Sequence, residues 1–70
     1  MSPKARRIET HDELHPGDAV LVFADGVYTV GIVVAVDPDQ IVFERRDTGA
    51  RLTANLPEAT VFLIEGGLPG

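Results

Sequence analysis

The sequence predicts a small all-β domain in which five short strands form a barrel. Three observations lead to this prediction. Apolar runs rich in β-branched residues recur at roughly 8–12-residue intervals, and clusters of turn residues separate them. Asp25-Gly26 stands between two such runs. It is the strongest two-residue hairpin signal, because both central residues of a type I′ turn need positive φ.

The start of the chain predicts no strand. Residues 1–9 are polar and basic, so we expect them to be flexible. Thr10 and Glu13 have the S/T-x-x-E spacing of a capping box, which predicts one helical turn that ends before Pro16. Residues 1–14 are therefore predicted to form a short flexible N-terminal tail that contains at most this single turn.

The predicted barrel spans residues 15–65, and glycine-rich residues 66–70 predict a C-terminal tail. The runs at residues 19–24 and 27–36 flank the Asp25-Gly26 turn and predict a long hairpin. Gly31 lies in the middle of the longer run. A glycine there allows a strand to bend and to bury opposite faces in its two halves.

A second hairpin and a closing strand complete the predicted barrel. Residues 40–46 and 50–55 predict the third and fourth strands, joined by a turn in which Gly49 suits positive φ. Residues 56–59 predict a short 3₁₀ turn, and residues 60–64 predict the last strand.

Composition excludes several classes of protein. A chain of 70 residues is too short for a doubly wound nucleotide-binding domain or an α/β barrel. The absence of cysteine excludes disulfides and thiolate zinc sites and fits a reducing compartment. We see no signal peptide, and the longest apolar stretch, residues 30–36, is too short to span a membrane. We therefore expect a cytoplasmic protein with no membrane partner, and its richness in Ala, Val, Gly, Asp and Arg suggests a bacterial or phage genome.

The order of a long hairpin, a second hairpin, a 3₁₀ turn and a closing strand resembles SH3-like barrels. Residues 17–33 also resemble the opening of Tudor-type domains, with a G-D-x-V start and one aromatic residue on each side of an acidic-Gly turn. The resemblance implies an aromatic cage for methylated Lys or Arg, built here from Phe23, Tyr28 and Phe43. Phe23 stands where Trp or Tyr is usual, and nearby Arg46 would repel a cation, so we do not expect methyl-lysine recognition.

The predicted partner-binding surface combines aromatic and charged side chains around the first hairpin and the third strand. Its residues are Phe23, Asp25, Tyr28, Phe43, Arg45 and Arg46. An aromatic residue at the edge of an apolar surface is typical of protein interfaces. The alternative is that the aromatic residues pack in the core and that the arginines pair with neighbouring carboxylates on a solvated face.

These residues indicate a small non-catalytic interaction module that binds a protein or peptide. One alternative is a nucleic-acid-binding accessory protein that uses the basic tail with Arg45, Arg46 and Arg51. The net charge of −5 argues against it, because phosphate contacts need a basic face. A further alternative is a homo-oligomeric structural or phage-type protein, joined through strand edges or through outward-facing Val33 and Ala35.

The sequence predicts no catalytic residue, metal site or cofactor, and hence no enzyme. Its one serine, Ser2, lies in the predicted tail, and no nucleophile–base pair is apparent. His11 and His15 have the i, i+4 spacing of some zinc ligands, but Pro16 prevents an intact helix there. Both histidines are therefore expected to belong to a solvated segment.

Overall fold

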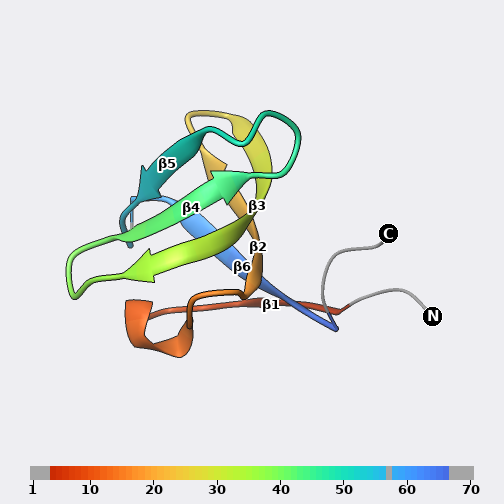
Figure 1. Ribbon diagram of the computed structural model, residues 1–70. Helices are drawn as coiled ribbons and strands as arrows, with labels where there is room; N and C mark the ends of the chain where they lie inside the picture. The colour runs from red at the N-terminus through yellow and green to blue at the C-terminus, as the bar shows by residue number, and fades with distance from the viewer. Residues whose placement is uncertain (1–3, 57, 67–70) are drawn as a thin grey trace.

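The computed structural model describes residues 4–56 and 58–66, which form an all-β fold with a single antiparallel sheet (Figure 1). The strand order across the sheet is β1-β6-β2-β3-β4-β5. The elements in chain order are β1 (Lys4–Arg7), the 3₁₀ helix η1 (His11–Glu13), β2 (Ala19–Ala24), β3 (Val27–Val36), β4 (Ile41–Arg45), β5 (Arg51–Ala54) and β6 (Thr60–Glu65). The all-β prediction is confirmed, but the predicted count of five strands is wrong.

The sixth strand comes from the segment that was predicted to be a tail. β1 pairs with β6, from Lys4 opposite Glu65 to Arg7 opposite Phe62. Its sequence, Lys-Ala-Arg-Arg, has no apolar alternation, and all four residues are exposed. The strand therefore exists because β6 offers an edge to pair with, which a local pattern cannot reveal.

The sheet is open within the described residues. β1 and β5 are its two edges, and no ladder joins them. Figure 1 shows the sheet curving, so that β4 and β5 lie across an interior from β1 and η1. The expected closure into a barrel is therefore not present in the pairing of the described strands.

The β2–β3 hairpin forms as predicted, and both of its strands have the predicted bounds. Ala24 pairs with Val27 across a two-residue turn. Asp25 and Gly26 have φ values of 53° and 77°, as a type I′ turn requires. This hairpin places Phe23 directly opposite Tyr28.

Gly31 lies where β3 packs tightly against β4. A Cβ atom at Gly31 would collide with the carbonyl oxygen of Glu44 and lie 2.9 Å from Cδ2 of Phe43. The register of β3 with β4 then shifts between Val33 and Ala35, which marks a β-bulge and increases the local twist. The close packing at Gly31 and the bulge are both consistent with the expected bend of β3 near its glycine.

The core lies on the inner, concave face of the sheet. It is assembled from side chains of almost every element, and its fully buried members are Ile8, Val20, Val33, Ile41 and Val61. Phe43 also belongs to it. Among the described residues, no buried residue is polar or charged. Val33 is 2% exposed, so the alternative in which Val33 faces outward as an oligomer seam is wrong.

Residues 4–14, which we call the N-terminal arm, are part of this core rather than a flexible tail. Ile8 and Leu14 are 1% and 2% exposed, and the Ile8 amide donates to the Val61 carbonyl at 3.0 Å. The single helical turn predicted from Thr10 and Glu13 is present as η1. The arm closes the open side of the curved sheet, because its two apolar side chains fill space that the strands alone leave uncovered.

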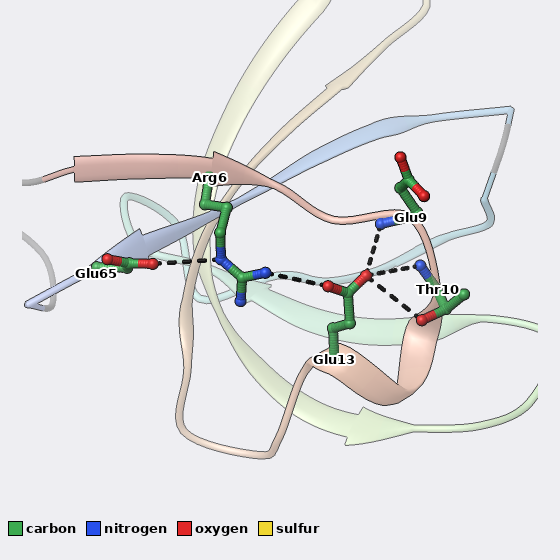
Figure 2. A network of polar contacts seen from close by, with 5 residues as sticks. All are labelled: Arg6, Glu9, Thr10, Glu13 and Glu65. Atoms are coloured by element: carbon green, nitrogen blue, oxygen red, sulfur yellow. Dashed lines mark hydrogen bonds and ion pairs between the residues drawn. The ribbon is translucent and has the colours of Figure 1, made fainter.

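A polar network fixes the N-terminal arm in place (Figure 2). The Arg6 guanidinium contacts Glu13 at 3.1 Å and Glu65 at 3.3 Å. The other Glu13 oxygen accepts the backbone N–H groups of Glu9 at 2.8 Å and Thr10 at 3.0 Å. These two amide bonds, and then Arg6, lower the pKa of Glu13. One carboxylate thus ties β1 to η1 and, through Arg6, to β6.

Some of the predicted segments include residues that lie outside the described part of the chain. The expected 3₁₀ turn at 56–59 includes one such residue, Pro57. On either side of it, the Ala59 amide donates to the Asn55 carbonyl at 2.8 Å. Residues 67–70 of the predicted C-terminal tail, like residues 1–3, also lie outside the described part. No helix in the described chain has the length and apolar character that a membrane crossing needs.

Candidate functional site: the outer face of the sheet

The candidate site lies on the outer face of the sheet, the side opposite the core. Strand residues alternate between the two faces, so the positions between buried Val20, Val22 and Val61 point outward. Large apolar residues occupy outward positions on the three neighbouring strands β6, β2 and β3, and we single out five of them that lie next to one another. This apolar outer face consists of Leu21, Phe23, Tyr28, Val30 and Phe62, and all five are partly or fully exposed.

Phe23 and Tyr28 form the aromatic pair of this face. They are register partners next to the type I′ turn, and their ring centroids lie 4.5 Å apart at an interplanar angle of 43°. Tyr28 is 63% exposed. A ring that is held by a neighbour and open to solvent can bury a large area against a partner at little cost in side-chain entropy.

A second line of outward residues crosses the sheet at right angles to the strands. Leu21 pairs with Phe62 on one side and with Val30 on the other. We call Phe62, Leu21 and Val30 the central row. Adjacent outward positions on neighbouring strands lie about 5 Å apart, so the three side chains form a continuous apolar strip.

Arginines stand at both ends of the central row. Arg7 pairs with Phe62 in the β1–β6 ladder. At the other end, the Arg46 amide donates to the Val30 carbonyl at 3.1 Å, which continues the β3–β4 register by one residue. Arg46 itself lies just past the end of β4, in the turn that follows. The strip is therefore apolar, with Arg7 beside one end and the backbone of Arg46 beside the other.

The structure separates Phe43 from the other predicted aromatic residues. Phe43 is 2% exposed and packs in the core, on the face opposite Phe23 and Tyr28. Its place in the predicted partner-binding surface is therefore wrong, and so is a cage in which these three rings would meet. The cause is the register: Phe43 pairs with buried Val33 and so shares its inward direction.

Arg45 and Arg51 are engaged with carboxylates. Arg45 donates to both oxygens of Asp47, at 3.0 and 2.7 Å, and these bonds lower the pKa of Asp47. Arg51 lies opposite Glu44 on the neighbouring strand, with their charged atoms 3.9 Å apart. The expected ion pairing on a solvated face is confirmed for these two arginines. Asp25 occupies the turn beside the Phe23–Tyr28 pair and is exposed.

A hollow of about 630 Å³ lies elsewhere, between η1 and the β3–β4 turn. His11 lines it, and each of its ring nitrogens has a backbone partner. Nδ1 lies 3.0 Å from the Pro38 carbonyl, and Nε2 accepts the Leu56 amide at 3.1 Å. This geometry requires Nδ1 to carry the proton. The expectation that His11 is solvated is wrong, because it connects the N-terminal arm to two loops.

The hollow does not offer its histidine as a metal ligand. Its rim carries Glu9, Asp12 and Asp37, but His11 has no ring nitrogen left for a ligand bond. Among residues 4–56 and 58–66, no three His, Cys, Asp or Glu side chains are placed to share an ion. The apolar outer face remains the stronger candidate for recognition.

Sequence reasoning found only part of the apolar outer face. It named Phe23 and Tyr28 but missed Leu21, Phe62 and Arg7. A signal was present in the run at residues 19–24, where Leu21 and Phe23 alternate with the smaller Val20 and Val22. Larger side chains at every second position of a strand indicate that these positions face away from a tightly packed interior.

The fold and site define an all-β domain with an open six-stranded antiparallel sheet and an apolar, partly aromatic outer face. Comparisons of the chain with protein-family models, with curated proteins and with solved structures found no match.

Proposed function

We propose that this protein is a non-catalytic interaction module that binds a protein or peptide through its apolar outer face. The single observation that carries this proposal is the Phe23–Tyr28 pair, a tilted aromatic pair whose tyrosine is 63% exposed. Exposed aromatic residues beside aliphatic ones are typical of the energetic centres of interfaces. The hairpin order from β2 to β6 supports a relationship with SH3-like, Tudor-like domains as part of this proposal.

The charged groups favour this function over nucleic-acid binding. Arg6, Arg45 and Arg51 each lie beside a carboxylate, which competes with phosphate for the same guanidinium. The whole chain carries a net charge of −5, which opposes a polyanion at long range. A protein partner needs no such basic field, because it gains from burying apolar area.

The test is affinity capture from a lysate of the source organism, with and without nuclease treatment, with three folded baits. These are the wild type, Tyr28→Ser and Leu52→Ser. Leu52 is a matched control because it is also a large, 38% exposed apolar residue but lies opposite core Phe43 rather than on the outer face. Circular dichroism first establishes that all three baits are folded.

We expect one protein to be retained by the wild type and by Leu52→Ser and to be lost with Tyr28→Ser. Equal retention by all three baits would place binding on another surface and contradict the proposal. Retention that disappears when nuclease is added would show instead that the protein binds nucleic acid.

A further inference from the structure

We infer that the free edge of β5 pairs with the same edge of a second copy of the chain, so that an antiparallel β5–β5 ladder joins two sheets into one. This surface is separate from the apolar outer face, and the inference therefore goes beyond the proposed function. It follows from the backbone groups of β5 that face away from β4 and from the side chain that lies between them.

The hydrogen bonds at the end of β4 show which residues face β5. The Arg45 amide donates to the Ala50 carbonyl at 2.8 Å, on the β5 side. The next amide, that of Arg46, donates in the opposite direction, to the Val30 carbonyl of β3. Successive residues of an antiparallel strand alternate in this way between their two neighbours. The bonded pair of Arg45 with Ala50 therefore sets the pattern for the rest of the β4–β5 ladder.

The same alternation continues along β5. Leu52 and Ala54 bond to β4, so Arg51 and Thr53 direct their backbone N–H and C=O groups away from it. β5 is an edge of the sheet within the described chain, and no described residue bonds to these outward groups. Arg51, Leu52 and Thr53 are all exposed. The edge thus offers the donors and acceptors of two residues, at the spacing of a strand.

This edge is complementary to itself. In an antiparallel β5–β5 pair with a two-fold axis at Leu52, Arg51 of one copy lies opposite Thr53 of the other, and each such pair exchanges two backbone hydrogen bonds. A register with Arg51 opposite Arg51 would instead bring like charges together. A register with Thr53 opposite Thr53 would place Arg51 against Asn55, whose carbonyl already accepts the Ala59 amide. The register centred on Leu52 uses every outward group without either conflict.

Leu52 supplies an apolar contact at the centre of this register. It lies opposite core Phe43 in the β4–β5 ladder and so shares the inner face, yet it is 38% exposed. At the two-fold axis the Leu52 residues of the two copies form a non-hydrogen-bonded pair, in which Cα atoms lie about 4.5 Å apart. Each leucine would cover the other, and the inner faces of the two sheets would become continuous.

Charge favours β5 over β1 as the edge that pairs. β1 carries Lys4, Arg6 and Arg7 among its four residues, and charged side chains on an edge strand resist pairing. β5 carries only Arg51, whose charge lies 3.9 Å from that of Glu44. Two copies joined at β5 have β1 at both outer edges of the combined sheet. The association therefore ends at a dimer.

Analytical ultracentrifugation of the full chain between about 10 μM and 1 mM measures this association. We expect a weak monomer–dimer equilibrium within this range, because two short edge strands bury less area than a standard interface. Added salt should favour the dimer, since it screens the repulsion between two chains of net charge −5. A chain that remains monomeric up to about 1 mM would overturn the inference.

The decisive variant is Leu52→Glu, which places two carboxylates opposite each other at the axis. Its matched control is Val27→Glu, because Val27 is 60% exposed and lies beside the β2–β3 turn, away from β5. Leu52→Glu should dimerise at least about tenfold more weakly, through like-charge repulsion and the lost apolar contact. Val27→Glu should dimerise as the wild type does. Circular dichroism establishes that both variants are folded.

Amide hydrogen exchange in the wild type tests the register without any substitution, and it decides the matter if Leu52→Glu does not fold. Exchange at Arg51 and Thr53 should slow as the protein concentration rises, because these amides gain partners only in the dimer. The Leu52 amide, which already bonds to β4, is the internal reference and should change little. A dimer in which exchange at Arg51 and Thr53 does not depend on concentration would place the interface elsewhere and contradict the inference.

The remaining outcomes separate this inference from the proposed function. Equal weakening by Leu52→Glu and Val27→Glu would overturn it, because net charge alone would then explain the effect. A dimer that is lost with Tyr28→Ser but kept with Leu52→Glu would also overturn it, since the copies would then meet through the outer face. Affinity capture that fails to distinguish Tyr28→Ser from the wild type contradicts the proposed function alone, because the β5 edge does not include Tyr28.

Discussion

The two faces of the sheet differ in a way that runs against the usual distribution of aromatic residues. The inner face is built mainly from valine, isoleucine and alanine, with Phe43 as its aromatic residue. The outer face carries Phe23, Tyr28 and Phe62, although aromatic side chains offer the largest apolar area for burial. Under the proposed function, these outer side chains are the ones that a second molecule would bury. The inner face should therefore determine stability, and the outer face should determine binding.

The largest expected effect on the free energy of unfolding is the difference between substitutions at Phe43 and at Tyr28. Phe43→Ala should lower the free energy of unfolding by about 3–5 kcal/mol, because it leaves a cavity in a small core. Tyr28→Ala should lower it by about 1 kcal/mol, since only a pairwise ring contact is lost. Urea unfolding followed by circular dichroism measures both. If Phe43→Ala does not fold, Phe43→Leu gives a smaller loss that remains measurable. Equal losses for the two alanine variants would contradict the contrast between the faces.

An intermediate effect concerns the N-terminal arm that closes the inner face. His11→Ala should cost about 1–2 kcal/mol, because the Leu56 amide and the Pro38 carbonyl both lose their partner. His15→Ala is the matched control, since His15 is exposed, and it should change stability by less than about 0.5 kcal/mol. Amide hydrogen exchange at Leu56 should accelerate only in the His11 variant. Unchanged exchange there would mean that the arm is held without His11.

The smallest effect is the pH dependence that Glu13 contributes. Its pKa is lowered from the ordinary value of 4.5, chiefly by the amides of Glu9 and Thr10. Ionised Glu13 therefore adds stability above pH 4.5, and this contribution is lost as the pH falls through the lower folded-state pKa. Unfolding midpoints across this range should fall more steeply for the wild type than for Glu13→Gln. Exposed Glu58 supplies the control: Glu58→Gln should keep the wild-type slope.

Local sequence signals predicted the elements that depend on local physics. The Asp25-Gly26 turn fixed the β2–β3 hairpin because few residues tolerate positive φ at both positions. The pairing of β1 with β6 left no such signal. It depends on partners about sixty residues apart, as in the contact of Arg6 with Glu65. Ile8 and Leu14 likewise become buried only once the curved sheet exists.

The candidate site, like the fold, was predictable only where a local signal determines it. The register of Phe23 with Tyr28 was predictable because the turn between them sets it. Phe43 was misplaced because a short strand with apolar residues on both parities does not show which parity faces the core. The bulge in β3, between Val33 and Ala35, further changes which residues face each other.

The two open edges of the sheet, β1 and β5, are sites at which further copies of the chain could pair. An unpaired edge strand presents backbone donors and acceptors to any other strand, and repeated edge-to-edge addition produces fibres. Three of the four residues of β1 are cationic, and β5 begins with Arg51. Charged side chains on an edge strand disfavour such addition, and three of them lie on β1: Lys4, Arg6 and Arg7. We therefore expect β1 to be a poorer template for edge-to-edge pairing than an apolar edge strand would be.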